Sequence, residues 1–362
     1  MKNPLNFIKK ANKSLNLYLE NFKKNQNFIY DYYKNQEILN NFISEHHNDH
    51  KKLDQLINQF NSDLENFSII DKARNDIEVK KEYFFKGKKN LLKEFFKDFP
   101  NITTDSIYEM CVYNDISFLT ILPNKNRIYL KTKEGIILTT NQNLFVLKEI
   151  FTQNSYLSPK LYEYEEFVFF DVGMHRGYAS LAIGQMNSCK AVYGFEIDSD
   201  TFNFAQENFA LNPRISKKIN PYQFGLSDSD KEVDIYAIPL SDGRTTTEDN
   251  ILNLNPSERE KYTLTKRAEI KQASKVLTQI IEKDHITSKI VLKIDTEGAE
   301  YEIFNDLYHS GVLNKIDLIM GECHYGMEKL EDYLNDFNPV LLDYQYNSKN
   351  ICTFYYEREK KF

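Results

Sequence analysis

From about residue 165 onward, short apolar runs alternate along the chain with helical stretches. Five of these runs are typical of strands, and they read FVFFDV, AVYGFEID, PYQFGLSD, IVLKIDTE and IDLIMGECH. Because the runs are largely apolar, both faces of the sheet that they form should be buried. The alternation therefore predicts an α/β fold with a mainly parallel sheet and helices on each side. We expect residues 330–358 to add one more helix and two strands, including an antiparallel edge pair.

A turn with two glycines follows the first apolar run. The run ends on Asp171, and the chain continues as V-G-M-H-R-G before an amphipathic helix. Gly173 and Gly177 would let a small molecule approach backbone amides at the start of that helix. A dinucleotide fingerprint crowds its glycines as G-x-G-x-x-G, so that a pyrophosphate can lie on bare backbone. The bulky Met-His-Arg insert therefore favours a nucleotide-type ligand without phosphates.

Each strand-like run ends on a polar residue. In an open α/β sheet, ligands bind outside the carboxyl ends of the strands, near the point where the strand order reverses. A carboxylate at the second of these ends, Glu196, can accept two hydrogen bonds from a ribose diol. Asp228 is placed where it could accept an adenine amino group. The series predicts a nucleoside-type site, and its members are Asp171, Glu196, Ser227 with Asp228, Asp295, and Glu322 with His324 beyond it.

Several blocks of the chain closely resemble the FkbM-type S-adenosylmethionine-dependent methyltransferases, namely D-V-G-x-x-x-G-Y, G-F-E, G-L-S-D, K-I-D-T-E-G-A-E-Y-E and G-E-C-H. The resemblance covers about residues 160–330. It implies a class I methyltransferase (Rossmann-like) fold with a mainly parallel, seven-stranded sheet. It also implies S-adenosylmethionine as the cofactor and methylation of hydroxyl oxygens, often on sugars or polyketide-like acceptors. Families of this kind usually have Ala-Asn after D-x-G, where this chain has Met174 and His175.

For this cofactor, the expected binding residues lie on the glycine turn and at the strand ends. Of the bulky turn residues, His175 could approach the transferred methyl or the acceptor, whereas Arg176 could face solvent. We expect the Tyr178 ring to pack against the sheet. The full set is Asp171, Gly173, His175, Gly177, Tyr178, Glu196, Ile197, Ser227, Asp228, Asp295 and Glu297.

Methyl transfer to oxygen requires alignment, exclusion of water and removal of the hydroxyl proton. Two catalytic arrangements are open. His324 could be the general base, because its ordinary pKa of about 6.5 suits proton removal. Alternatively, Asp295, Glu322 and His324 could together bind a divalent metal ion, since two carboxylates and an imidazole are plausible ligands. Glu300 reads as an acid favoured at a helix start.

The chain is expected to have three parts. Residues 1–100 form a helical region, either a cap or an oligomerisation element, because apolar residues recur there at helical spacing. Residues 101–160 form a short β-rich segment, with antiparallel strands expected in 116–123, 126–140 and 144–151. Residues 161–362 form the methyltransferase domain. The polar loop 241–250 could hold a hydroxylated acceptor, and Arg244 in it could pair with a phosphate.

Composition narrows the partners and the location. The net charge of −7 argues against a general nucleic-acid binder. The four scattered cysteines fit a reducing compartment. No apolar run approaches the roughly 18 residues that span a bilayer, and no signal peptide is evident, so we expect a cytoplasmic protein without membrane insertion.

Three functions are weighed. The first is an O-methyltransferase that uses S-adenosylmethionine and acts on a sugar, sugar nucleotide or glycan precursor, as in capsule or surface polysaccharide synthesis. The second is an NAD-dependent oxidoreductase, which would need a denser glycine fingerprint. The third is a non-catalytic assembly protein that uses the N-terminal helices. A carbohydrate acceptor is the expected partner, and the helices could also form a homo-oligomer.

Overall fold

A computed structural model describes residues 96–97, 99, 102–107, 110–111, 114–122, 125–141, 143–237, 245–247, 257, 260–261, 263–340, 345–346 and 351–359. Residues 1–95, which hold most of the predicted N-terminal helical region with its proposed role as a cap or in oligomerisation, lie outside the described residues. Arg244 also lies outside them. No helix of the described part of the chain is long and apolar enough to cross a membrane.

The centre of the structure is a mainly parallel sheet. Five strands run parallel in the order β6-β5-β4-β11-β12, and β15 joins antiparallel beside β12. β13 completes a seven-strand path beyond β15, and β14 also pairs with β15. The strands are β4 (Phe167–Val172), β5 (Cys189–Phe195), β6 (Ile219–Tyr222), β11 (Lys289–Ile294), β12 (Leu318–Cys323), β13 (Phe337–Pro339), β14 (Gln345–Tyr346) and β15 (Cys352–Arg358). This order confirms the predicted Rossmann-like sheet and places the reversal between β4 and β11.

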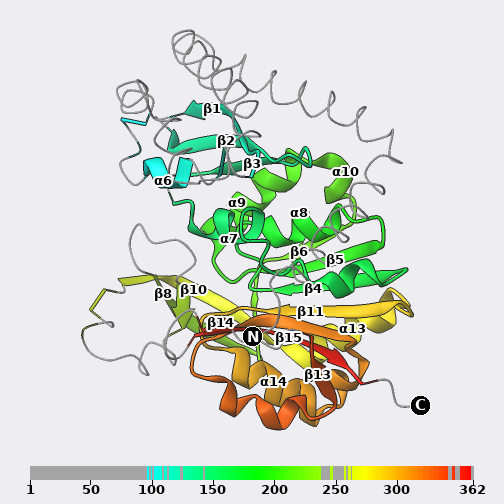
Figure 1. Ribbon diagram of the computed structural model, residues 1–362. Helices are drawn as coiled ribbons and strands as arrows, with labels where there is room; N and C mark the ends of the chain where they lie inside the picture. Colours follow the sequence, from blue (N-terminus) through cyan, green and yellow to red (C-terminus); the bar gives the residue numbers. More distant parts are fainter. Residues whose placement is uncertain are drawn as a thin grey trace, which may run out of the picture.

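Helices cover both faces of this sheet, as Figure 1 shows. Alternate residues of β4 point to opposite sides: Phe169 belongs to the core under α7, α8 and α9, whereas Phe170 belongs to the core under α13 and α14. Both rings are fully buried, which stabilises the fold by about 1.5–3 kcal/mol per side chain. The helices are α7 (Phe145–Phe151), α8 (Tyr178–Gly184), α9 (Ser199–Ala210), α10 (Pro213–Ser216), α13 (Ala273–Lys283) and α14 (Glu300–His309).

The third predicted strand was wrong in its extent. β6 ends at Tyr222, and Gly225–Ser227 form β7 in a separate four-stranded sheet of order β7-β10-β8-β9. β6 is the edge strand of the central sheet and contains Pro221, which lacks an N–H to extend a ladder. The inserted sheet also contains β8 (Lys231–Ala237), β9 (Thr245–Thr247) and β10 (Thr263–Gln272).

The segment before the central sheet is a three-stranded antiparallel meander followed by a helix. β1 (Ser117–Leu122), β2 (Arg127–Lys131) and β3 (Ile137–Thr140) pair in sequence order, as predicted. The expected strand at 144–151 is instead the helix α7, because its buried residues Leu147 and Ile150 are three positions apart. The meander packs beyond α9 (Figure 1), where the buried Asn208 amide oxygen accepts from the Thr139 amide at 2.7 Å.

Short helical turns complete the described elements. The helix expected after residue 330 is a single 3-10 turn, η7. These turns are α6 (Thr104–Ile107), η4 (Pro159–Tyr162), η5 (Val312–Lys315), η6 (Met327–Lys329) and η7 (Glu331–Leu334).

Candidate active site

The glycine turn between β4 and α8 lies at the point where the strand order reverses. Gly173 and Gly177 have φ of +77° and +75°, a backbone conformation that favours glycine. A Cβ added to Gly173 would lie 1.7 Å from the carbonyl oxygen of Asp295, at the end of β11. The Met174 amide donates to the Phe195 carbonyl at 2.8 Å, at the end of β5. The turn is therefore pinned between the ends of two neighbouring strands.

Asp171 is fully buried beneath this turn. It accepts a hydrogen bond from Ser180 Oγ at 2.6 Å and forms an ion pair with Lys293 Nζ at 3.3 Å. Lys293 Nζ in turn donates to the Gly173 carbonyl at 2.6 Å. Burial alone would lower the pKa of Lys293, but the carboxylates of Asp171 and Asp295 outweigh it and raise that pKa. Asp171 therefore orients the turn through Lys293 from the interior of the domain.

Sequence reasoning missed Lys293, although a signal was present. A lysine inside the otherwise apolar run IVLKI requires a buried anion, since an unpaired buried charge is costly. Lys293 and Asp171 are register partners on the neighbouring strands β11 and β4.

Glu196 follows β5 and is 7% exposed. Its Oε2 accepts from the His175 amide and its Oε1 from the Asp198 amide, both at 2.8 Å. Burial is the main reason why the pKa of Glu196 is raised. Each carboxylate oxygen retains a second lone pair, so Glu196 can still accept from a ribose diol. Ile197 beside it packs against the apolar cluster of the inserted sheet.

Asp295, Glu322 and His324 converge at the carboxyl ends of β11 and β12. One potential ligand atom from each residue lies within 4.8 Å of the others. His324 Nδ1 lies 3.2 Å from Glu300 Oε1, and His324 Nε2 lies 3.9 Å from Glu322 Oε2. The structure thus brings together the three residues that the sequence proposed for a metal site. This set of side chains fits a divalent cation, because Glu300 holds His324 Nδ1 and leaves His324 Nε2 directed toward the carboxylates.

The charge state of His324 bears on its proposed role as a base. Burial would lower the pKa of His324, but the nearby carboxylates of Glu300 and Glu297 raise that pKa well above its ordinary value. Glu297 Oε2 lies 3.5 Å from His324 Nε2, and burial raises the pKa of Glu297 to about 8. A protonated imidazole can neither take the acceptor proton nor ligate a cation, so His324 must lose its proton before it acts in either role.

Glu300 has a larger role than the helix-start reading gave it. Its side chain is fully buried. Its Oε1 accepts from the Thr296 and Gly298 amides at 2.7 and 3.2 Å and also contacts His324. Glu300 therefore stabilises the turn after β11 and also fixes the orientation of the His324 imidazole.

Two residues from α7 and the turn after it also reach this site. Tyr156 donates its hydroxyl hydrogen to Asp295 Oδ2 at 3.0 Å, and burial together with Asp295 raises the pKa of Tyr156 well above its ordinary value. Burial, followed by the negative charges of Asp295 and Glu322, raises the pKa of Glu149 to about 8. Both lie before the region of family resemblance, so no motif indicated them.

The side chains of Tyr178 and Arg176 bond to the meander, whereas Ser227 and Asp228 lie at the end of β7. Tyr178 is buried, and its hydroxyl donates to the Thr139 carbonyl of the meander at 3.0 Å. Arg176 is buried against the meander, where its NH1 donates to Asn141 Oδ1 at 3.2 Å, contrary to the expected solvent position. Ser227 is buried at the end of β7, and Asp228, which follows it, is exposed.

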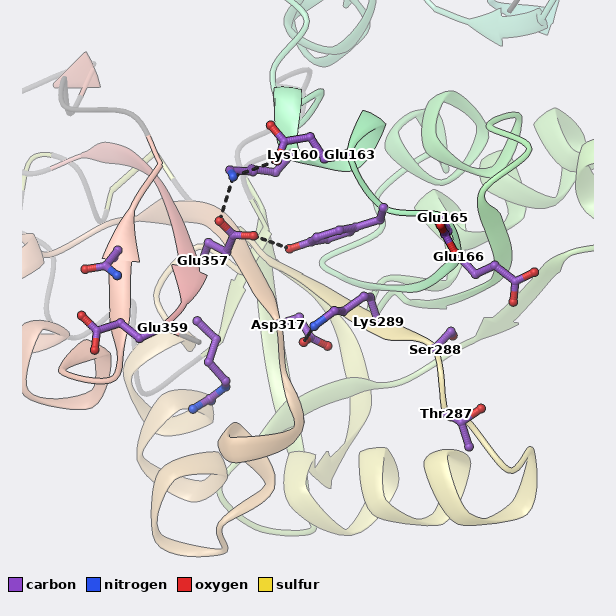
Figure 2. Close-up of a pocket in the computed structure, with 13 residues that line it drawn as sticks. Lys160, Glu163, Glu165, Glu166, Thr287, Ser288, Lys289, Asp317, Glu357 and Glu359 are labelled. Atoms are coloured by element: carbon purple, nitrogen blue, oxygen red, sulfur yellow. Dashed lines mark hydrogen bonds and ion pairs between the residues drawn. The ribbon is translucent and has the colours of Figure 1, made fainter. Parts of the chain in front are cut away.

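A hollow of about 790 Å³ lies at the amino ends of the parallel strands, opposite the site just described (Figure 2). Its lining includes Lys289 at the start of β11 and Glu357 near the end of the antiparallel β15. Lys160 Nζ and Glu357 Oε2 form an ion pair of 3.0 Å on its lining. In open α/β sheets, ligands bind outside the carboxyl ends of the strands, so the active site is not assigned to this hollow.

Residues 171–348 match a family model described as the methyltransferase FkbM domain. No curated protein matches the chain at a significant level. Among solved structures, the chain is similar to the methyltransferase FkbM of Methylobacillus flagellatus KT, with 13% identity over 56% of this chain and 47% of that one, and a TM-score of 0.35.

Two further structures are similar at the same low level. TrmK of M. capricolum, solved with S-adenosyl-homocysteine, is 12% identical over 56% of this chain and 70% of that one, with a TM-score of 0.33. A protein of the NADB-Rossmann superfamily from Streptococcus agalactiae is 15% identical over 57% of this chain and 70% of that one, with a TM-score of 0.32.

Proposed function

Because residues 171–348 belong to the FkbM methyltransferase family and S-adenosylmethionine is the cofactor, we propose that the protein methylates a hydroxyl of a sugar, sugar nucleotide or glycan precursor. The observation that carries the acceptor chemistry is the convergence of Asp295, Glu322 and His324 at the ends of β11 and β12. Such a cluster suits an acceptor that presents hydroxyl oxygens. The family match favours this function over an NAD-dependent oxidoreductase or an inert assembly protein.

The cofactor would lie along the ends of β4 and β5. When bound, S-adenosylmethionine supplies an electrophilic methyl group on a sulfonium. Glu196 would accept the ribose hydroxyls, and the narrow turn at Gly173 would bring the backbone close to the rest of the ligand. Ile197 offers an apolar surface beside Glu196 for a base ring.

The acceptor would meet the acidic cluster from the other side. A divalent cation held by Asp295, Glu322 and His324 would lower the pKa of a coordinated hydroxyl. Glu300 would keep the imidazole oriented through Nδ1. The convergence of these ligand atoms within 4.8 Å supports a cation-assisted reaction over a lone histidine base.

Charge and cysteine state support the remaining parts of the proposal. The net charge of −7 favours a carbohydrate acceptor over nucleic acid. The cysteines show no disulfide framework in the sequence, and on that basis we propose a reducing, cytoplasmic location.

The test is a methyl-transfer assay with S-adenosylmethionine tritiated in its methyl group. Sugars, sugar nucleotides and RNA are offered separately, with Mn²⁺ or with excess EDTA. We expect label in a sugar or sugar nucleotide, and we expect EDTA or Glu322→Gln to abolish it. Glu331→Gln is the matched control, because Glu331 is an exposed acid at the start of η7, the short helical turn before β13. Label in RNA would contradict the acceptor, and EDTA-resistant transfer would contradict the cation.

A further inference from the structure

Tyr156 lies outside the family domain but inside its active site. It precedes residue 171, where the family match begins, and it follows α7 in a tight turn. Its side chain is 2% exposed. Nothing in the family pattern assigns it a role, yet its hydroxyl reaches the end of β11.

The hydroxyl of Tyr156 holds one oxygen of Asp295. It donates to Oδ2 at 3.0 Å, and Lys293 Nζ lies 3.7 Å from the same oxygen. Lys293 Nζ also lies 5.1 Å from the centroid of the Tyr156 ring. A carboxylate with one oxygen held from two sides cannot rotate freely, so the direction of its second oxygen is set as well.

The backbone at Tyr156 is in a conformation that a tyrosine rarely adopts. Its φ is +67°, in the left-handed region. The turn is maintained by the Ser155 amide, which donates to the Glu149 carbonyl at 3.1 Å, and by the Tyr156 amide, which donates to the Tyr355 hydroxyl oxygen at 3.5 Å. A bulky residue kept at such a position despite the strain points to a use for its side chain.

From these contacts we propose that Tyr156 is a positioning residue that sets the orientation of Asp295 for the cation and the acceptor. The inference rests on the proposed function. It makes the segment before the family domain a working part of the active site, through the hydrogen bond from Tyr156 to Asp295. Partners of this kind, which bond a ligating carboxylate, change metal affinity or activity by about 10–100-fold when removed.

The test compares Tyr156→Phe with Tyr164→Phe in the full chain. Tyr164 is the matched control, because it also donates its hydroxyl hydrogen to a carboxylate, Glu357 Oε1 at 3.2 Å, but at the opposite edge of the sheet. Mn²⁺ affinity is measured by the loss of the free-ion electron paramagnetic resonance signal, and S-adenosylhomocysteine affinity by calorimetry. We expect Tyr156→Phe to weaken Mn²⁺ binding by about 10–100-fold, with unchanged S-adenosylhomocysteine affinity and a loss of thermal stability similar to that of Tyr164→Phe, since each variant loses one hydroxyl–carboxylate hydrogen bond.

The outcomes separate this inference from the function beneath it. If the wild-type chain binds no Mn²⁺, the proposed cation site and this inference both fail. If the wild type binds Mn²⁺ and Tyr156→Phe binds it as tightly as Tyr164→Phe does, only the inference fails. Once an acceptor is known, kcat should fall in Tyr156→Phe while KM for S-adenosylmethionine stays constant.

A second variant covers the case in which Tyr156→Phe does not fold. Tyr355→Phe removes the hydroxyl that accepts from the Tyr156 amide and leaves the Tyr156 side chain intact. We expect a loss of Mn²⁺ affinity smaller than that of Tyr156→Phe, because the turn loosens. No loss in Tyr355→Phe would then overturn the inference.

Discussion

Gly173→Ala separates the strain of a left-handed residue from a collision at the active site. Gly173 has φ of +77°, and an added Cβ would lie 1.7 Å from the Asp295 carbonyl oxygen. Real Cβ atoms stay at least 3.0 Å from such atoms, so the turn and the end of β11 must separate by about 1.3 Å, the difference of the two distances. A displacement of about 1 Å at a reacting centre can cost about 100-fold in rate.

Gly311→Ala is the matched control for this substitution. Gly311 has nearly the same φ, +76°, but its added Cβ would meet nothing closer than Asn314 Nδ2 at 4.0 Å. Both variants should therefore lose about 1–2 kcal/mol of unfolding free energy from the left-handed conformation alone. Only Gly173→Ala should lose further stability, bind S-adenosylhomocysteine more weakly and transfer the methyl group about 100-fold more slowly.

The assays are urea unfolding and calorimetry on the same protein samples. If Gly173→Ala matched Gly311→Ala in stability and kept the wild-type affinity for S-adenosylhomocysteine, the turn would not be part of the cofactor site. The reasoning that ties Gly173 to Asp295 would then be refuted.

Three further predictions concern Glu196, Glu149 and Asn208. Glu196→Gln should weaken S-adenosylhomocysteine binding by about 10–100-fold in calorimetry, because it removes a charged acceptor of the ribose diol; unchanged affinity would contradict the ribose assignment. The pKa of Glu149 is about 8 in the folded protein against 4.5 ordinarily, so the unfolded chain releases a proton that the folded chain keeps, and stability should fall as pH rises from 4.5 to 8. Glu149→Gln should flatten this fall in urea unfolding at several pH values, and an identical slope would contradict it. Asn208→Ala should cost about 2–4 kcal/mol of unfolding free energy, because it leaves the Thr139 amide and the Arg176 carbonyl without their buried partner; a loss below about 0.5 kcal/mol would contradict that account.

The sequence predicted those parts of the site that depend on one strand or on two neighbouring strands. The apolar runs located β4, β5, β11 and β12, and their polar ends located Glu196, Asp295 and Glu322. Asp295 and His324 come together because β11 and β12 are parallel neighbours, so that their carboxyl ends lie on the same side of the sheet.

The parts that were missed depend on contacts between distant segments. Tyr156 meets Asp295 across 139 positions of the chain, and no local pattern encodes such a pair. The strand expected at 144–151 failed for a related reason: its apolar run suits a short strand or a buried helix equally, and packing on α8 decides for the helix. Gly225–Ser227 continued an apolar run but left the sheet after Pro221.

A crystal structure of the full chain with S-adenosylhomocysteine and Mn²⁺ tests the central claim most directly. We predict the ribose hydroxyls on Glu196 and an anomalous Mn²⁺ peak between Asp295, Glu322 and His324. Cofactor density in the hollow beside Lys289 and Glu357, or Mn²⁺ away from the three ligands, would contradict the assignment of the active site to the carboxyl ends of the strands.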